Sequence, residues 1–327
     1  MKVLKYLGDF ISHDLAESVH DTVLKRLNIA KLAIYEIRNV LEDRRANKVG
    51  GTNVGLQLWE FTIEPMLFYN SSSWLDTSKN TIKVLNSLYN QWHCCLFRIG
   101  SGAPSANFFW LCGNRTPENI ILEEKMKLYF HLKNLPTNSL GREVIEAQER
   151  NKHLPSLVKE LEKHLAEMGE DPSKTSKNIW KKRVKSYIRK KTREDLLNLL
   201  KKNKKINFEA ISKEQFEKKK YFNEMDLQTV RMRVRIAMGM VNKIKGNFKD
   251  KYRKRNTSIT CPSCKSENEN STEDPITEKP QDTQNHLLET CVAFKELRES
   301  IDTTTDFGLV SFFREVVKRR IEAELNE

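Results

Sequence analysis

Four residues toward the C-terminal end have the types and the spacing that hold a metal ion. A Cys-Pro-Ser-Cys turn supplies two thiols, and after twenty-one further residues a histidine stands five positions before a third cysteine. Thiolate sulfur and imidazole nitrogen in two close pairs suit tetrahedral zinc, and four protein ligands leave no open position for a substrate. The spacing therefore predicts one structural Zn2+ ion, held by Cys261, Cys264, His286 and Cys291.

The alternative is that these are ordinary residues of an unfolded stretch, because residues 267–284 are nearly all Ser, Glu, Asn, Asp, Thr and Pro. Two observations favour zinc. Every other His and Cys lies before residue 165, so this region holds one complete ligand set. The chain has 6 cysteines, too few for a disulfide scaffold, and a reducing compartment would keep them as thiols.

A second group of metal-binding residue types, His93-Cys94-Cys95 with Cys112, lies among tryptophan, leucine and phenylalanine. Free cysteine is one of the residue types most often found in protein cores. We therefore expect buried thiols at these positions and not a second metal site.

Common catalytic patterns are missing from the sequence. It has no Gly-x-x-x-x-Gly-Lys phosphate loop, no His-Glu-x-x-His, no Gly-x-Ser-x-Gly and no adjacent pair of aspartates. Nucleotidyl transfer needs clustered carboxylates that hold two metal ions. The chain is therefore predicted to have no enzymatic activity of its own and no catalytic residue.

Positive charge is concentrated in one part of the chain. The formal net charge is +13, yet residues 151–260 contain 31 Lys and Arg against 13 Asp and Glu, a surplus of 18 that leaves the remainder at −5. Such a local surplus is typical of a surface that faces nucleic acid, because each neutralised phosphate releases counterions. RNA or DNA is the expected partner, with contacts predicted from Lys181, Lys182, Arg183, Lys185, Arg189, Lys190, Lys191, Arg231, Arg233, Arg235, Lys249, Lys251 and Arg253.

Aromatic residues are interleaved with these basic runs and admit two interpretations. They could be platforms on which unpaired bases stack, or they could be core residues. A run of lysines is, by itself, more often a solvated helix face than a binding site. The aromatic residues are Trp180, Tyr187, Tyr221, Phe222, Phe248 and Tyr252.

Apolar spacing predicts a mainly helical fold. Three- and four-residue steps from Val19 to Leu41, after Asp14 and Glu17 at capping-box spacing, predict a helix over 14–41. Thr116-Pro117 predicts the start of another helix, because proline is favoured at the first helical position, where its missing N–H costs nothing. We further expect a strand over 3–7, a buried helix over 54–69 bent near Pro65, helices over 78–97, 142–150, 155–167 and 177–200, a loop over 100–114 and a linker over 168–175.

These elements suggest a helical bundle followed by a basic helical region and one small zinc module of the CCHC type. No apolar run approaches the ~20 residues needed to cross a bilayer, and residues 1–11 are too charged for a signal peptide. We expect the nucleus or the cytoplasm and no membrane. The predicted domains are a bundle at 1–100, a helical connector at 101–170, the basic region at 171–257, the zinc module at 258–298 and a C-terminal helix at 299–327.

In this order the motifs resemble a known family. Lys5-Tyr6-Leu7-Gly8 before a helix, residues 64–70 reading Glu-Pro-Met-Leu-Phe-Tyr-Asn, and Trp74 are similar to the start of the thumb in non-LTR (LINE-class) retrotransposon reverse transcriptases. Asn247-Phe248-Lys249, the Cys-Pro-x-Cys turn and residues 282–291, reading Asp-Thr-Gln-Asn-His-Leu-Leu-Glu-Thr-Cys, resemble the C-terminal zinc segment of the same proteins.

The resemblance implies a thumb-like bundle and a zinc segment that handle template, primer or target nucleic acid. The family's catalytic Asp-Asp motif has no counterpart here, and its fingers and palm would lie upstream of Met1. The family would also allow a palm-containing reverse transcriptase chain as a partner, and no small-molecule substrate is expected.

Other readings stay open. The bundle of residues 14–99 could be the working surface of a protein-interaction scaffold, with the basic region serving only solubility or nuclear targeting. The chain could also complete an enzyme whose palm comes from another chain, or it could be a decayed gene fragment without a selected role. A steep fall of affinity with salt would distinguish nucleic-acid binding from an apolar protein contact.

Overall fold

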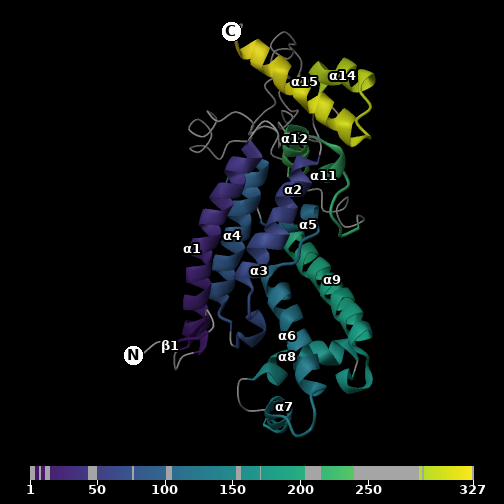
Figure 1. Ribbon diagram of the computed structural model, residues 1–327. Coiled ribbons are helices and arrows are strands. Elements are labelled where there is room, and N and C mark those ends of the chain that lie inside the picture. Colours follow the sequence, from purple (N-terminus) through teal and green to yellow (C-terminus); the bar gives the residue numbers. More distant parts are fainter. Residues whose placement is uncertain are drawn as a thin grey trace, which may run out of the picture.

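The computed structural model is mainly helical, which confirms the predicted fold class (Figure 1). The N-terminal helices form the middle of the molecule, and the described C-terminal helices lie at one end. Within the described residues, no helix is both long and apolar enough to cross a lipid bilayer. The structure describes residues 4–6, 9–11, 15–42, 50–75, 77–100, 105–151, 156–169, 171–202, 215–238, 287–288 and 291–325.

The chain opens with a small antiparallel pair of strands and a long helix. β1 (Leu4–Tyr6) pairs with β2 (Asp9–Ile11), so that Leu4 is opposite Ile11. The sequence predicted the first strand and missed the second. α1 (Leu15–Glu42) confirms the predicted helix, and seven buried residues lie on one side of it at an average spacing of about 3.7 residues: Val19, Val23, Leu27, Ala30, Ile34, Ile37 and Leu41.

The second helix is continuous but changes its winding in the middle. α2 (Gly51–Leu58) runs into a π-helical segment, η1 (Trp59–Ile63), and then into α3 (Glu64–Leu67). Pro65 lacks an N–H and crowds the carbonyl one turn earlier, so a regular α-helix cannot pass through it unchanged. The wider π turn, in which the Glu64 N–H donates to the Trp59 carbonyl, lies directly before this proline. The bend predicted near Pro65 therefore takes the form of a π segment.

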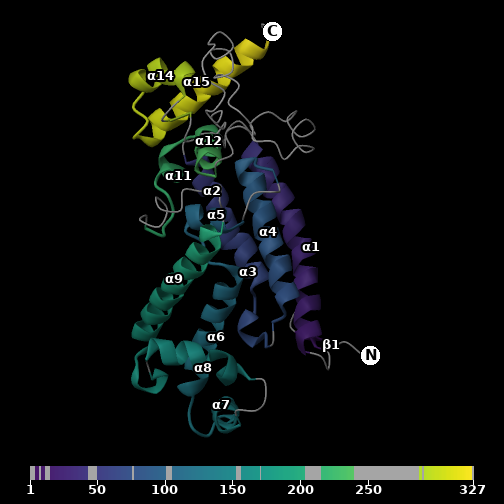
Figure 2. The same ribbon diagram turned by 180° about the vertical axis from the view of Figure 1, so that it is seen from behind.

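α4 (Lys79–Phe97) begins where the sequence predicted, since the hydroxyl of Ser78 accepts a hydrogen bond from the Thr81 N–H at 3.1 Å. The short 3-10 turn η2 (Ser71–Ser73) connects it to the preceding helix. α4 packs along α1, as both views show (Figures 1 and 2).

The loop predicted over residues 100–114 is wrong for most of its length. α5 (Ser105–Cys112) lies there, and all its residues from Ala106 to Cys112 are buried. A helix that is apolar on every side has no periodic pattern, so spacing could not reveal it. Its aromatic residues fill the middle of the bundle core.

The next four helices form a second packed unit. Serine or threonine hydroxyls cap three of them: Thr116, Ser139 and Ser156 each accept a backbone N–H three residues later. All four were predicted from the sequence: the start of the first was placed correctly, and the boundaries of the other three are shifted by up to two residues. They are α6 (Pro117–Lys133), α7 (Leu140–Arg150), α8 (Leu157–Met168) and α9 (Lys177–Lys201), with the 3-10 turn η3 (Pro172–Lys174) before α9.

The linker expected at residues 168–175 does not separate two packing units. Leu161 before it and Trp180 after it belong to one hydrophobic cluster with Met126. The Asn134 side-chain amide also donates to the Pro172 carbonyl at 3.3 Å. The α6–α9 unit therefore spans the expected boundary.

The last described helices pack into two clusters, since Tyr221 and Phe222 belong to the core of the bundle and the helices that follow contribute to a third cluster. The Asp226 carboxylate caps α12 by accepting the N–H groups of Gln228 and Thr229. Residues of α12, α14 and α15 then share one core with Leu287 and Cys291. The elements are α11 (Tyr221–Glu224), α12 (Leu227–Ala237), the 3-10 turn η7 (Val292–Phe294), α14 (Lys295–Ser300) and α15 (Asp306–Leu325).

Candidate nucleic-acid interface

α9 contains most of the predicted nucleic-acid contacts that the structure describes, and its buried residues follow an unusual spacing. They recur at every fourth position without exception: Trp180, Val184, Ile188, Thr192, Leu196 and Leu200. Four residues turn an α-helix by about 400°, so this stripe moves about 40° round the helix at each step. The buried side of α9 therefore rotates along its length.

This rotation lets α9 connect two cores. Trp180, Val184 and Ile188 pack into the cluster of the α6–α9 unit, whereas Leu196 and Leu200 belong to the core of the bundle. Figure 1 shows the corresponding path, with α9 running obliquely from α8 up to α5.

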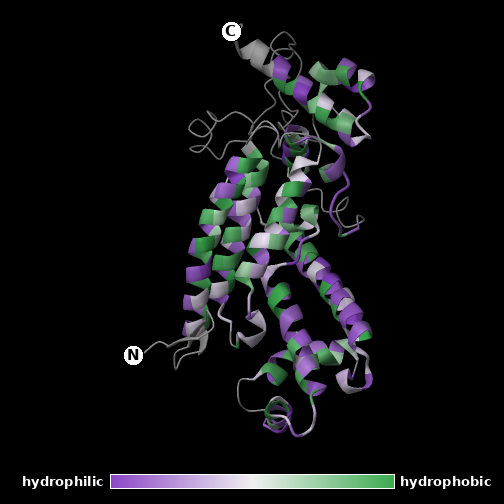
Figure 3. Ribbon diagram, in the orientation of Figure 1, coloured by the Kyte–Doolittle hydropathy of each residue, from purple (hydrophilic) through white to green (hydrophobic). Residues whose placement is uncertain are grey.

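A row of basic residues accompanies the buried stripe one position further along. The residues at every fourth position from 177 are Lys177, Lys181, Lys185, Arg189 and Arg193. Successive members are separated by about 6 Å along the helix axis, at 1.5 Å per residue. The first four are exposed, and α9 as a whole contains ten Lys and Arg against two acidic residues. Figure 3 shows hydrophilic residues, in purple, along most of α9. We name these five residues the basic row.

Three contacts outside the row hold α9 in place. The Trp180 indole donates to the Met126 carbonyl at 3.3 Å, and its ring stacks on Phe130 with centroids 5.4 Å apart. Near the other end, the Asn119 amide donates to the Asp195 carboxylate at 3.3 Å. Arg189 itself has a structural contact, since its guanidinium donates to the Phe216 carbonyl at 2.8 Å.

The remaining predicted contacts on α9 differ in how exposed they are. Lys182, Arg183 and Lys190 are exposed. Lys191 is half-buried and lies 3.4 Å from the Asp195 carboxylate. Within the described part of the chain, no carboxylate is within ion-pair distance of Lys181, Lys182, Lys185 or Lys190.

Tyr187 lies on the side of α9 that faces α8. Its hydroxyl donates to Glu167 at 2.5 Å and is 2.8 Å from His164 Nδ1. Burial, followed by the hydrogen bond to Glu167, raises the Tyr187 pKa, and the same hydrogen bond lowers the pKa of Glu167. Tyr187 thus connects α8 and α9. Trp180, Tyr221 and Phe222 are buried core residues, so the core interpretation holds for these three. Phe248 and Tyr252 lie outside the described residues.

The arginines of α12 have packing roles. Arg231 is buried and donates to the Leu96 carbonyl at 2.9 Å, and Arg235 donates to the Arg98 carbonyl at 2.8 Å. Both carbonyls are at the C-terminal end of α4, where helical carbonyl groups lack partners within the helix. Arg233 donates to Asp306 at 2.5 Å and lies over the Tyr221 ring. These contacts join α12 to α4 and α15, and the phosphate contacts expected of the same arginines stay a prediction.

Part of the predicted interface lies outside the described residues. This applies to Lys249, Lys251 and Arg253, and to three predicted zinc ligands, Cys261, Cys264 and His286. Cys291 is described and fully buried, in one cluster with Leu287 and Phe294. The Leu287 carbonyl accepts a hydrogen bond from Arg298 at 3.0 Å. No group of three potential metal ligands occurs within the described ranges.

The His93-Cys94-Cys95 group is partly a core feature, as predicted. His93 is fully buried, stacked on Phe108 at 5.2 Å, and burial lowers its pKa to about 3. Cys112 is buried and burial raises its thiol pKa, whereas Cys94 and Cys95 are half-buried. The His93 imidazole is therefore neutral at physiological pH.

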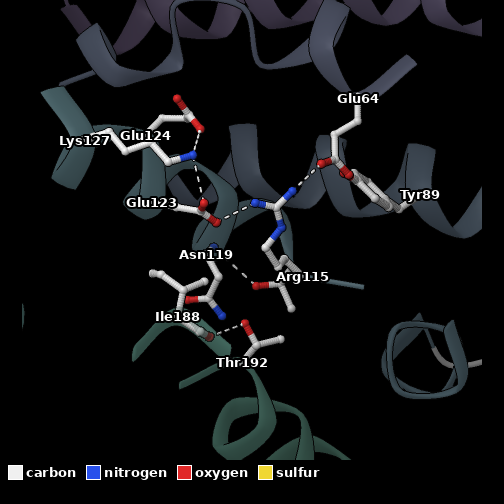
Figure 4. A network of polar contacts seen from close by, with 10 residues as sticks. Glu64, Tyr89, Arg115, Asn119, Glu123, Glu124, Lys127, Ile188 and Thr192 are labelled. Atoms are coloured by element: carbon white, nitrogen blue, oxygen red, sulfur yellow. Dashed lines mark hydrogen bonds and ion pairs between the residues drawn. The ribbon is translucent and has the colours of Figure 1, made fainter. Parts of the chain in front are cut away.

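A polar network that the sequence did not reveal connects the bundle to the α6–α9 unit (Figure 4). Arg115 donates to Glu64 of α3 at 2.7 Å and to Glu123 of α6 at 2.5 Å. The Tyr89 hydroxyl donates to Glu64 at 2.9 Å, and Lys127 lies 2.8 Å from Glu123. Glu64 is 51 residues before Arg115, and the residues of the network carry no common motif.

Charge compensation in this network differs between its two carboxylates. Burial raises the pKa of Glu64, and the nearby Arg115 only partly offsets that effect. Burial acts in the same direction on Glu123, but Arg115 and Lys127 outweigh it and lower the Glu123 pKa. Glu123 therefore stays ionised and holds Arg115 firmly.

Comparisons with known proteins found no matching family model, no curated protein and no solved structure similar to this chain.

Proposed function

We propose that this chain binds RNA or DNA through the basic row of α9, as a fragment related to a non-LTR retrotransposon reverse transcriptase without polymerase activity of its own. The observation that carries the proposal is the row itself. Its exposed lysines are evenly spaced on a helix anchored at both ends, and carboxylates that could neutralise them are engaged elsewhere. Because the helix is already folded, a phosphate backbone can bind along this row without ordering the protein backbone first, and only the lysine side chains lose freedom.

The predicted binding has little sequence preference. Lysine contacts to phosphate are electrostatic and carry no base information directly. The aromatic residues described near α9 are buried or hydrogen bonded, so the described surface offers charge and not stacking platforms. Affinity should therefore depend steeply on salt and only weakly on sequence.

The test is a salt titration of binding to labelled single-stranded RNA and duplex DNA. The variant Lys181→Gln/Lys185→Gln removes two charges of the basic row, four residues apart. We expect the slope of log affinity against log salt to fall by about 1.4 on single strands and about 1.8 on duplex DNA.

The matched control is Lys79→Gln/Lys83→Gln, which removes two exposed lysines at the same spacing on α4. It should leave the salt slope unchanged. Equal losses in both variants would mean that binding follows net charge alone, and the assignment to α9 would fail.

We also propose that Cys261, Cys264, His286 and Cys291 bind one structural zinc ion. The ligand types and their spacing support this, and Cys291 lies in the buried cluster shared by α12, α14 and α15. Leu287, which directly follows His286, lies in the same cluster. Binding of the zinc ion would then be coupled to folding of this segment, and the ion would have no catalytic role.

Metal content measured by mass spectrometry tests the zinc proposal. Cys264→Ser should reduce zinc from about one ion per chain to a small fraction. Cys94→Ser, on α4, should leave the metal content unchanged. Full zinc occupancy in Cys264→Ser would exclude this ligand set.

A further inference from the structure

The outer side of α1 carries exposed apolar side chains among polar ones, and its charges are balanced. Its described large apolar residues are Leu24, Ile29, Leu32, Tyr35 and Val40, of which Leu32 has 70% of its surface exposed. Single exposed apolar residues are ordinary, but several on one face of one helix mark an interaction surface. α1 lies at the edge of the molecule in both views (Figures 1 and 2).

The charge of α1 indicates what kind of partner fits. The helix contains four acidic and four Lys or Arg residues, so its net charge is zero in a chain of +13. A phosphate backbone would gain nothing from such a face. Two copies of it, in contrast, can approach without the repulsion that two copies of α9 would experience.

The positions of the apolar residues are symmetric. Leu32 is about 200° round the helix from both Ala30 and Ile34, which face the core, and so it lies at the centre of the outer side. Ile29 and Tyr35 lie three residues to either side of Leu32, and Leu24 and Val40 lie eight residues to either side. A twofold contact requires one patch to be complementary to itself, with residues before the axis meeting residues after it.

Two charged residues favour the antiparallel orientation. Lys25 lies near one end of the exposed row, and Glu36 lies on the other side of Leu32. When two helices cross antiparallel at Leu32, Lys25 of each copy comes next to the Glu36 end of the other. A parallel crossing would bring like charges together.

We propose that α1 pairs with α1 of a second copy of this chain, antiparallel about Leu32, so that the protein forms a twofold dimer. This surface is separate from the basic row on α9, and the dimer would present two basic rows. A single helix pair buries less than a standard interface of roughly 800 Å2 per partner, so we expect a dissociation constant in the micromolar range.

Sedimentation velocity of the full chain measures this association directly. The sample is treated with nuclease and kept in high salt, so that nucleic acid cannot bridge two copies through α9. We expect the mass to rise from monomer to dimer between about 1 and about 100 µM. A chain that stays monomeric across this range would overturn the proposal.

Two sets of variants locate the contact. Leu32→Glu puts two like charges at the twofold axis and should weaken the dimer by at least about tenfold. Leu140→Glu is the control, because Leu140 on α7 is 74% exposed, close to Leu32. If both variants weaken association equally, or neither does, α1 is not the interface.

Charge reversal tests the orientation. Lys25→Glu and Glu36→Lys should each weaken the dimer, and the double variant should restore it. Failure of the double variant to recover would exclude the antiparallel arrangement. These results do not depend on nucleic-acid binding, so the dimer and the proposed function can fail separately.

Discussion

The bundle of α1 to α5 and the α6–α9 unit are both helical, but aromatic packing dominates the core of the first and ion pairs enclose the core of the second. In the bundle, Trp59 stacks on Trp92 with centroids 5.5 Å apart, and Tyr89 contacts Phe109 at 5.3 Å. The α6–α9 unit has a smaller core enclosed by ion pairs, including Lys133 with Glu149 at 2.8 Å and Lys125 with Glu160.

The exposed charge of α9 is a consequence of this difference. Lysines of α6 pair with carboxylates of α7 and α8, and Tyr187 occupies Glu167. Few carboxylates remain for the basic row. The ion pairs thus stabilise a small core and, at the same time, leave a cationic helix open to solvent.

The largest effect on stability is expected from a substitution in the core of the α6–α9 unit, which should destabilise that unit and leave the bundle folded. Trp180 has 1% of its surface exposed, and Trp180→Ala should lower the free energy of unfolding by about 3–5 kcal/mol. Hydrogen exchange should show lost protection in α6–α9, with α1 and α4 still protected.

Ile179→Ala is the matched control, because Ile179 neighbours Trp180 but is 48% exposed. It should change the unfolding free energy by less than about 0.5 kcal/mol. Loss of protection across the whole chain in Trp180→Ala would mean that the two regions unfold as one unit.

The second expected effect belongs to the bundle and depends on pH. Burial lowers the His93 pKa to about 3 from 6.5, so the folded state resists protonation more than the unfolded state does. Above pH 6.5 the His93 ring is neutral in both states and does not change the free energy of unfolding. As the pH falls from 6.5 toward 3, only the unfolded state takes up the proton, and the free energy of unfolding falls progressively. By about pH 4.5 the loss should reach about 3 kcal/mol.

His93→Phe should flatten this pH dependence, because a neutral ring replaces the titrating one. Denaturant unfolding between about pH 7 and pH 4.5 measures the difference. An unchanged slope in the variant would show that His93 is not the group that makes the bundle sensitive to acid.

The smallest effect concerns the connection between the two regions. Arg115→Met removes the cation between Glu64 and Glu123, and the Arg115 side chain is 37% exposed. Solvent screening reduces the cost, which we expect to be about 1–2 kcal/mol. A double-mutant cycle of Arg115→Met with Glu123→Gln should show that the interaction between the two side chains stabilises the folded state.

Arg150→Met on α7 provides the control for loss of an exposed arginine. If Arg115→Met is no more harmful than this control, the network in Figure 4 is not what couples α3 to α6.

Local signals made most helices predictable. The spacing from Val19 to Leu41 gave α1, Ser78 marked the start of α4, and Thr116-Pro117 marked that of α6. These signals depend on residues a few positions apart, which the sequence displays directly. α5 had no such signal, because it is apolar on all sides.

The candidate site was only partly predictable. Seven basic residues of α9 were predicted as contacts, but Lys177 and Arg193 of the basic row were not, because the row follows from the four-residue spacing of the buried stripe. In the sequence, Arg231 and Arg235 could not be distinguished from the exposed basic residues of α9. Only the fold shows that they reach the end of α4. The ion pair between Arg115 and Glu64 joins residues 51 positions apart, and such a long-range contact leaves no local pattern.

The four-residue spacing in α9 also constrains how this gene can change in length. A substitution in α9 changes one side chain, but a single inserted codon between Ile188 and Leu196 would rotate every later residue of the helix by about 100° about its axis. Asp195 would then occupy the place of Leu196 in the bundle core, and Leu199 that of Leu200. Over evolutionary time, α9 should tolerate substitutions of its exposed residues far more readily than any insertion or deletion.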